Sequence, residues 1–382
     1  MSRRRLCAGL ALGVLPGAGL AFRPTLGVLP GAGLAFRPPQ GVLPGAGLAF
    51  EPPQQVAALP TQLAARSPLL AIARAGARIV AAGPRGHIVW SDDDGAHWTQ
   101  AAVPVSSDLL AISFPSARHG WAVGHGGVVL HSADGGATWQ RQLGGREANE
   151  LALRHFESRA ATDAQAATLL QREKAQGADG STPSFLDVHF SSATSGFIVG
   201  TFNRIFRTED GGRTWTPWMD RTQNPGDLHF YAVRGSARGI FLAGEQGMVW
   251  RLEPQGQRFE AVATPYKGTL FGLVATDAGM LLAYGMRGRL FRSDDEGRQW
   301  QAVTGVGTAG ITAGAALPGG AVVLVDQAGG IALSRDGGQR FLPVPALQPM
   351  PYFGVAALGA QRIGLVGAAG ARLQTLAIDQ IK

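Results

Sequence analysis

The most regular feature of the chain is an aspartate that recurs within the pattern Ser/Thr-x-Asp-x-Gly-x-x-Trp/Phe. Carboxylates serve as the acid and base of glycosidases when two of them lie about 5–10 Å apart. The same side chains can instead accept hydrogen bonds from neighbouring backbone N–H groups and so stabilise a tight turn. We interpret the pattern, here called the Asp box, as such a turn and predict no catalytic residue in it. The boxes pair Asp93 with Trp98, Asp134 with Trp139, Asp210 with Trp215, Asp295 with Trp300 and Asp336 with Phe341.

A secreted glycosidase of the sialidase kind is the alternative, because sialidases carry the same box. Such an enzyme needs three arginines for the substrate carboxylate, a tyrosine paired with a glutamate, and a separate aspartate acid. Tyrosines are scarce in this chain: Tyr231, Tyr266, Tyr284 and Tyr352. The alternative stays open at this point, because spacing along the chain does not give the separation of two carboxylates.

The remaining reactive residue types show no arrangement of their own. The eight histidines form no H-E-x-x-H motif, and Cys7 is the only cysteine, which excludes a cysteine-based metal site from the rest of the chain. Most of the formal charge of +7 comes from five arginines in the first 50 residues, which leaves 29 basic and 27 acidic residues in 51–382. We therefore predict no metal, no cofactor and no nucleic-acid partner.

A repeat of about 41 residues organises the chain from residue 51 onward. Eight residues before each box lies a Gly-x-x-Gly turn or a close variant, and one such turn follows without a box. Residues 109–143 contain, in order, two apolar strands, the glycine turn, a third strand, the box and a fourth strand. Four antiparallel strands per repeat are typical of a β-propeller blade. The seven turns, at 83–86, 124–127, 200–203, 244–247, 285–288, 326–329 and 367–370, predict an all-β, seven-bladed propeller.

Two segments depart from this rhythm. The last repeat ends without a box, and residues 55–60 resemble the fourth strands elsewhere, so we expect them to pair with the last blade and close the ring. Residues 144–183 lengthen one interval and are rich in Ala, Glu, Gln, Arg and Leu. This composition predicts a helical insertion between blades 2 and 3, within a propeller domain of residues 51–382.

Residues 1–50 have the character of an export signal. Arginines 3–5 precede an apolar run that ends in small residues, as in a secretory signal peptide. The decapeptide GVLPGAGLAF follows at 13–22, 27–36 and 41–50, and a proline interrupts each copy. No copy reaches the roughly 20 apolar residues of a membrane-spanning helix. We expect the protein to be exported.

Strand alternation predicts which face of the propeller binds a partner. The turns between second and third strands should share one face with the crossings between blades, and the insertion should leave from that face. There the helices would form a raised wall beside the central opening. Arginine forks bind carboxylates bidentately. The candidate partner-binding residues on this face are Arg85, Arg204, Arg287 and Arg289.

The repeated form G-x-x-G-x-φ-φ-x-T/S-x-D-G-G-x-T-W, as in 124–139 and 200–215, resembles the photosystem II stability and assembly factor family. The similarity runs from about Val56 to the C terminus and includes the insertion and the exported N terminus. Members are lumenal or periplasmic seven-bladed propellers that act without catalysis. The resemblance implies a scaffold or chaperone-like binder of a membrane-protein client, located in the periplasm or thylakoid lumen. We expect it to be a monomer.

Overall fold

The computed structural model of the chain describes residues 51–178 and 180–377. Residues from Glu51 onward form one compact unit by their internal contacts. The expected signal peptide and the triplicated segment fall within 1–50, outside the described residues, and both remain predictions.

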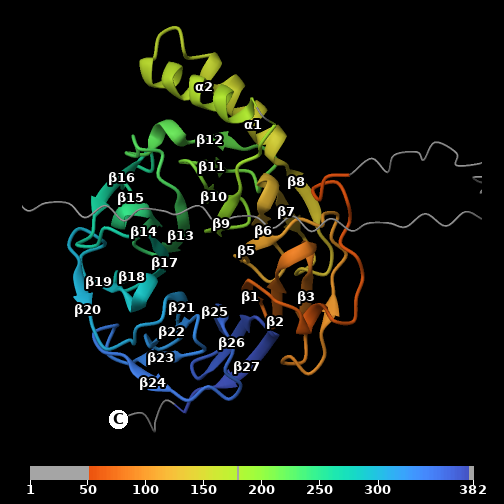
Figure 1. Cartoon of the computed structure of the whole chain (residues 1–382), viewed down its shortest axis with the longest axis vertical. Coiled ribbons are helices and arrows are strands. Elements are labelled where there is room, and N and C mark those ends of the chain that lie inside the picture. Colours follow the sequence, from red (N-terminus) through yellow and green to blue (C-terminus); the bar gives the residue numbers. More distant parts are fainter. Residues whose placement is uncertain (1–50, 179, 378–382) are drawn as a thin grey trace, which may run out of the picture. The chain divides into compact units, whose positions relative to one another are not determined.

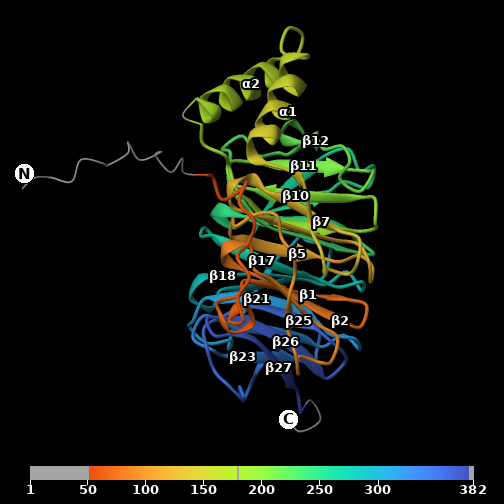
Figure 2. The same ribbon diagram turned by 90° about the vertical axis from the view of Figure 1, so that its right-hand side faces the viewer.

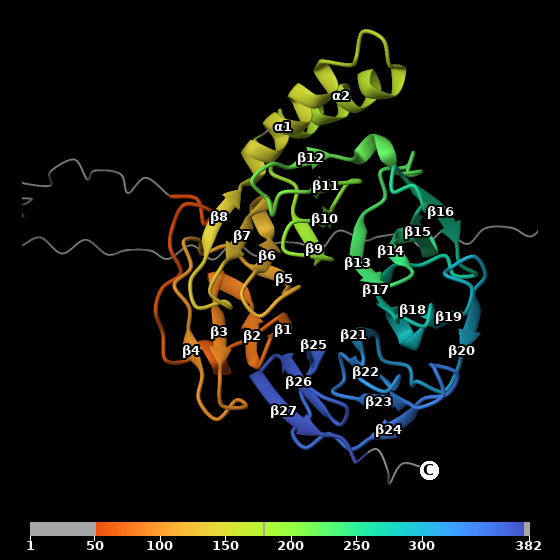
Figure 3. The same ribbon diagram turned by 180° about the vertical axis from the view of Figure 1, so that it is seen from behind.

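Seven antiparallel sheets follow one another around a central axis, which confirms the predicted seven-bladed propeller (Figures 1 and 3). In each sheet the strands follow chain order from the innermost outward. Blade 1 contains β1 (Ala71–Ala75), β2 (Arg78–Ala82), β3 (Ile88–Ser91) and β4 (Thr99–Gln100). Blade 2 contains β5 (Leu109–Ser113), β6 (Gly120–Gly124), β7 (Val129–Ser132) and β8 (Gln140–Leu143). Blade 3 contains β9 (Phe185–Phe190), β10 (Gly196–Gly200), β11 (Ile205–Thr208) and β12 (Thr216–Pro217).

The remaining blades repeat this order, except that the last has three strands among the described residues. Blade 4 contains β13 (Phe230–Ser236), β14 (Gly239–Gly244), β15 (Met248–Leu252) and β16 (Phe259–Ala263). Blade 5 contains β17 (Leu270–Ala275), β18 (Leu281–Gly285), β19 (Leu290–Ser293) and β20 (Gln301–Val303). Blade 6 contains β21 (Ile311–Ala316), β22 (Val322–Asp326), β23 (Ile331–Ser334) and β24 (Leu342–Val344). Blade 7 contains β25 (Tyr352–Ala357), β26 (Arg362–Gly367) and β27 (Gly370–Thr375).

The core lies between adjacent blades. The second strands, such as β6, β10 and β18, are buried along their whole length. Because a neighbouring blade covers each face of these strands, a continuous apolar run suits them better than alternation. Trp121 of β6 stacks on Phe190 of β9, with ring centroids 3.5 Å apart, and joins blades 2 and 3.

Each Asp box is a turn closed by its own side chains. In the box of blade 1, the Ser91 hydroxyl donates to Asp93 Oδ1 at 2.8 Å and accepts from the Gly95 N–H at 2.8 Å. Asp93 Oδ1 also accepts from the His97 N–H at 2.9 Å. The boxes of blades 2, 3, 5 and 6 have the same bonds. The box carboxylates therefore hold turns together.

The box turns also join neighbouring blades. Arg78 of blade 1 donates to the Asp134 carbonyl in the box of blade 2, at 3.3 Å. Arg207 of β11 donates to the Gly256 carbonyl of blade 4 at 3.2 Å, and Arg292 of β19 to the Gly337 carbonyl of blade 6 at 2.6 Å. Each turn thus serves as an anchor for the blade before it.

The insertion contains α1 (Gly145–Glu157) and α2 (Ala164–Gly177), which confirms a helical insertion between blades 2 and 3. The two helices pack against β12 and the short helix η4 (Met219–Arg221). Figures 1 and 2 show both helices beyond β12, away from the innermost strands. The expected wall beside the central opening is therefore wrong. Phe156 and Leu169 instead join the core cluster that contains Trp218, at the outer edge of blade 3.

Closure of the ring by residues 55–60 is also wrong. These residues form no strand, and the Ala58 N–H donates to the Val103 carbonyl, which lies on the crossing from blade 1 to blade 2. Prolines 52, 53 and 60 lack the N–H that a sheet ladder requires. Blades 7 and 1 meet directly instead, through the Leu69 N–H bond to the Gly367 carbonyl at 3.1 Å.

The box aspartates predict how stability depends on pH. Hydrogen bonds from the backbone and ring of His97, and from Ser91, lower the pKa of Asp93 to about 2. An aspartate whose pKa is lower in the folded state stabilises the fold above its unfolded pKa of about 3.9, and this stabilisation disappears as pH falls through the folded pKa. An Asp93→Asn variant should therefore melt below wild type near pH 7, and the gap should shrink between about pH 4 and pH 2. Thermal unfolding of both proteins across this range tests it; a gap that is unchanged at pH 2 contradicts it.

Candidate functional site

One face of the propeller is formed by the turns between second and third strands and by the crossings between blades; we call it the turn face. Backbone bonds join the two sets of segments. The His125 N–H in the turn of blade 2 donates to the Asp108 carbonyl of the preceding crossing at 2.9 Å, and the Gly247 N–H to the Gly268 carbonyl at 2.7 Å. The insertion leaves β8 from the same face, because α1 contacts the turn of blade 2. The opposite face carries the Asp boxes.

Three of the four candidate arginines are exposed on the turn face. Arg85 and Arg287 occupy turns with positive φ values of 58° and 55°, and Arg289 follows directly after the second of these turns. None of the three has an acidic ion-pair partner in the part of the chain that the structure describes. Arg85 belongs to blade 1 and the other two to blade 5, so the three do not form a single cluster.

The fourth, Arg204, is not available to a partner, and its assignment is wrong. Its exposed fraction is 1%. Its guanidinium donates to Glu173 Oε2 of α2 at 2.5 Å and to Asn149 Oδ1 of α1. The insertion covers this turn, and a buried glutamate requires a cation beside it. Arg204 therefore holds both helices to blade 3.

Sequence analysis missed a second feature, the exposed apolar side chains. All five large ones among the described residues lie in turn-face turns, in a crossing or in the N-terminal segment: Leu59, Leu63, Phe202, Met286 and Leu347. Phe202 and Met286 are 49% and 50% exposed. Both stand at middle positions of the Gly-x-x-Gly turns, where a large apolar residue in a tight turn was the available sequence signal. Exposed apolar groups gathered on one face are typical of an interaction surface.

A hollow of about 670 Å³ lies on this face where the N-terminal segment crosses the turn of blade 1. Its walls include Val56, Leu59 and Leu63, and its edge includes Arg85 and His87. Burial, together with the charge of Arg85, lowers the pKa of His87, so the imidazole is neutral at pH 7. The hollow therefore combines apolar walls with one guanidinium.

The end of the central channel at the turn face is lined by a repeated structural device. In six blades the innermost strand has a β-bulge near its start, and a bulge turns the extra residue out of the ladder. These residues line a hollow of about 230 Å³ with Leu70 of blade 1. They are Leu110, Leu186, Tyr231, Phe271, Thr312 and Phe353. Five of these seven residues are Leu or Phe, but polar atoms supply most of the exposed lining of the hollow.

Below this ring lies an ion pair between neighbouring blades. Arg234 of β13, whose side chain is 40% exposed, donates to the buried Asp187 Oδ2 of β9, which also accepts from the Val233 N–H at 2.8 Å. Burial raises the pKa of nearby Tyr284 to about 12, so its phenol is neutral. Burial also lowers the pKa of His189 to about 4. Asp187 and Arg234 therefore join blades 3 and 4.

The predicted box residues remain structural in this arrangement. Trp139, Trp215, Trp300 and Phe341 are buried, and Trp98 is half-buried. No group of three metal-ligating side chains occurs within residues 51–178 and 180–377. In the same ranges, neither helix is long and apolar enough to cross a membrane. Nothing in these residues favours the glycosidase alternative.

A family model described as photosynthesis system II assembly factor YCF48 matches residues 79–160 and 174–351. The photosystem II assembly protein Ycf48 of Synechococcus sp. (strain JA-2-3B'a(2-13)) is 27% identical over 41% of this chain and 53% of its own length. The chloroplastic stability/assembly factor HCF136 of Cyanidioschyzon merolae is 39% identical over 22% of this chain and 18% of its own length. The matched stretch thus spans about half of the first relative and less of the second.

Solved structures share the fold. "YCF48 bound to D1 peptide" aligns with a TM-score of 0.61 and 18% identity, over 84% of this chain and 96% of that chain. The WD40 propeller domain of Doa1 aligns with a TM-score of 0.58 and 8% identity, over 84% of this chain and 95% of that chain. At these identities the likeness concerns the fold alone.

The clamp at Arg204 gives a stability prediction. An Arg204→Met variant should lose about 3–5 kcal/mol of unfolding free energy, because Glu173 is left buried without its cation. Replacing both residues, Arg204→Met with Glu173→Leu, should recover most of the loss. Arg287→Gln, an exposed control, should stay within about 0.5 kcal/mol of wild type. Urea unfolding measures the stability of all three variants. An Arg204→Met variant as stable as wild type would contradict the stabilising role of Arg204.

Proposed function

The chain belongs to the photosynthesis system II assembly factor YCF48 family, and from this membership we propose that it is a non-catalytic assembly factor that binds a membrane-protein client. The client segment would be a loop or terminus exposed on the exported side of the membrane. The D1 peptide bound to the related YCF48 structure is the model for such a segment. Binding without catalysis agrees with the fixed roles of the box aspartates.

The observation that carries the proposal is the uneven distribution of exposed apolar and cationic groups. Within the described ranges, every large exposed apolar side chain belongs to a turn-face segment or to the N-terminal segment that crosses it. Arg85, Arg287 and Arg289 stand on the same face without acidic partners. Apolar side chains bury surface when a partner binds, and unpaired guanidinium groups orient the partner by pairing with its carboxylates. We therefore assign the client to the turn face.

The N-terminal sequence and one relative support an exported location. The arginine-led apolar run of residues 1–50 supports export, and one relative is named a photosystem II assembly lipoprotein. We propose a periplasmic or thylakoid-lumen protein that works as a monomer. In that compartment the turn face would meet segments of membrane proteins as they emerge.

A defined peptide tests the assignment of the turn face. A synthetic D1 peptide should bind the wild-type protein, and the combined variant Arg85→Gln, Arg287→Gln and Arg289→Gln should bind about tenfold more weakly, because three guanidinium groups are lost. Thermal unfolding should change little, since the three side chains are exposed. Isothermal titration calorimetry supplies the affinities.

The matched control removes the same charge from the Asp-box face. Arg213, Arg298 and Arg340 are exposed there, and their replacement by Gln should leave the affinity within about twofold. If both triple variants bound the peptide equally weakly, the loss of affinity would be an effect of net charge and not of the turn face. An unchanged affinity of the turn-face variant would move the client to another surface.

A further inference from the structure

Three segments of the propeller break the repeat, and they meet at one place. The first is the helical insertion, and the second is the crossing from blade 3 to blade 4, residues 218–229, which is the longest crossing apart from the insertion. The third is the decayed box of blade 4, residues 252–259, which keeps only its glycine and its aromatic residue. In a scaffold built from equal repeats, a shared location for three of the departures indicates a specific use; the missing box of blade 7 lies elsewhere in the ring.

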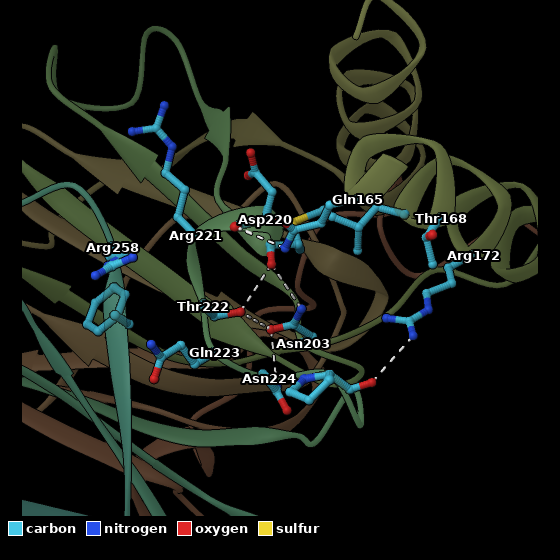
Figure 4. Close-up of a pocket in the computed structure, with 14 residues that line it drawn as sticks. Gln165, Thr168, Arg172, Asn203, Asp220, Arg221, Thr222, Gln223, Asn224 and Arg258 are labelled. Atoms are coloured by element: carbon cyan, nitrogen blue, oxygen red, sulfur yellow. Dashed lines mark hydrogen bonds between the residues drawn. The ribbon is translucent and has the colours of Figure 1, made fainter. Parts of the chain in front are cut away.

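The meeting place is a cleft of about 540 Å³ at the rim, which we call the rim cleft (Figure 4). Its lining comes from the three irregular segments and from the turn of blade 3. The insertion contributes Gln165, Thr168, Leu169 and Arg172; blade 3 contributes Asn203; the crossing contributes Met219, Asp220, Arg221, Thr222, Gln223, Asn224 and Pro225; and the decayed box contributes Arg258 and Phe259. No Asp box with its aspartate intact is among them.

Ion pairs fix α2 as one wall of the rim cleft. The four lining residues of α2 occupy positions i, i+3, i+4 and i+7, so they share one side of the helix. Arg172 pairs with Asp227 of the crossing at 2.6 Å, and Arg159 pairs with Asp220 at 2.6 Å. The buried clamp at Arg204 holds the other side of the insertion.

A buried polar network forms the floor. Asn203 Oδ1 accepts from the Thr222 hydroxyl at 2.8 Å and from Asn224 Nδ2 at 3.1 Å, and Asn203 Nδ2 donates to the Met219 carbonyl at 3.2 Å. The three side chains are 8% exposed or less. A fully bonded buried network is rigid. The shape of the cleft is therefore present before any ligand arrives.

The rim cleft offers one uncommitted cation. Arg172 and Arg258 have acidic partners, whereas Arg221 has none in the described ranges. Its guanidinium lies over the Trp218 ring, 4.9 Å from the centroid, and its hydrogen bond to Gln257 Oε1 is long, at 3.5 Å. Asp220 is not available to a ligand, because its side chain is 6% exposed and pairs with Arg159.

The cleft extends along the rim. A second hollow, of about 430 Å³, shares Arg221 and continues past Trp218 and Gln257 to the box of blade 3. Small-molecule pockets are usually enclosed and mostly apolar. The second hollow has mostly polar walls, whereas the rim cleft has both polar and apolar walls, and the two join at one guanidinium. This elongated arrangement suits an extended ligand that carries polar and apolar groups.

We propose that the rim cleft binds an extended polypeptide segment that carries an acidic side chain. The carboxylate of the segment pairs with Arg221, and the chain of the segment lies along the two adjoining hollows. The planar guanidinium can form two parallel bonds to the carboxylate while it remains stacked on Trp218. This site lies between α2 and blades 3 and 4, apart from the arginines of blades 1 and 5. The rim cleft therefore shares segments with the turn face but none of the three arginines, and the variants of the two sites can be tested separately.

The test uses two peptides that differ in one group. The first is an acetylated and amidated peptide of Ala and Gly residues with a single central Glu, and the second has Gln at that position. Titration of the isotope-labelled protein, followed by its amide NMR signals, should shift Gln223, Asn224 and Gln257. The Glu peptide should bind about tenfold more tightly than the Gln peptide, because only its carboxylate pairs with Arg221.

Three variants decide the outcome. Arg221→Gln should abolish the preference for Glu and Arg221→Lys should retain part of it, while Arg298→Gln, an exposed control on the box of blade 5, should retain all of it. The triple variant of Arg85, Arg287 and Arg289 should bind the Glu peptide as wild type does. Equal affinity for both peptides, or shifts confined to the turns of blades 1 and 5, would overturn the proposal. Loss of D1-peptide binding in the triple variant alone would leave the rim cleft unaffected.

Discussion

Contact between neighbouring blades is the interaction on which every other feature of this molecule depends. A single sheet of four short strands has two apolar faces and cannot bury either of them alone. The stack of Trp121 on Phe190 and the bonds from Arg78, Arg207 and Arg292 to the next box all cross such a contact. The ring is complete only where blade 7 meets blade 1, and the backbone bond from Leu69 to Gly367 lies there. The box turns thus help to hold neighbouring blades together in a closed ring.

The rigid ring holds the irregular segments in fixed positions, where they can form a binding site. The insertion is tied to blade 3 by one buried cluster, in which Arg204 neutralises Glu173 and bonds Asn149. Since a buried ion pair of this kind contributes little net stability over an apolar contact, its effect here is to fix where the helices lie. Their position in turn creates the wall of the rim cleft. The regular blades form a rigid scaffold, and the segments that depart from the repeat form the proposed binding cleft.

The chemistry of the described residues is that of binding. The box carboxylates are held by their own turns, and the ion pair of Asp187 and Arg234 is fixed between two blades. Among the described residues, the exposed groups without partners include the guanidiniums of Arg85, Arg287 and Arg289 and the five exposed apolar side chains. Groups of this kind are typical of recognition surfaces. Membership in a family of assembly factors agrees with these exposed apolar and cationic groups.

The sequence by itself determined the number of blades, the turn role of the boxes and the presence of the insertion. Each of these depends on local rules: strand period, turn residues and helix composition act within one repeat. Arg85 and Arg287 were correctly placed on exposed turns for the same reason.

Only the tertiary structure decided which turn is covered and where each segment lies. Arg204 has the same position in its repeat as Arg289 in its own, yet one is buried and the other exposed. The insertion makes the difference, because it covers Arg204. Its apolar side chains pack against Trp218 at the rim and not beside the channel. Residues 55–60 look like a strand but lie along a crossing, because a strand pairs only where a partner edge and free N–H groups coincide. Burial and pairing depend on contacts between distant parts of the chain, and no local pattern contains them.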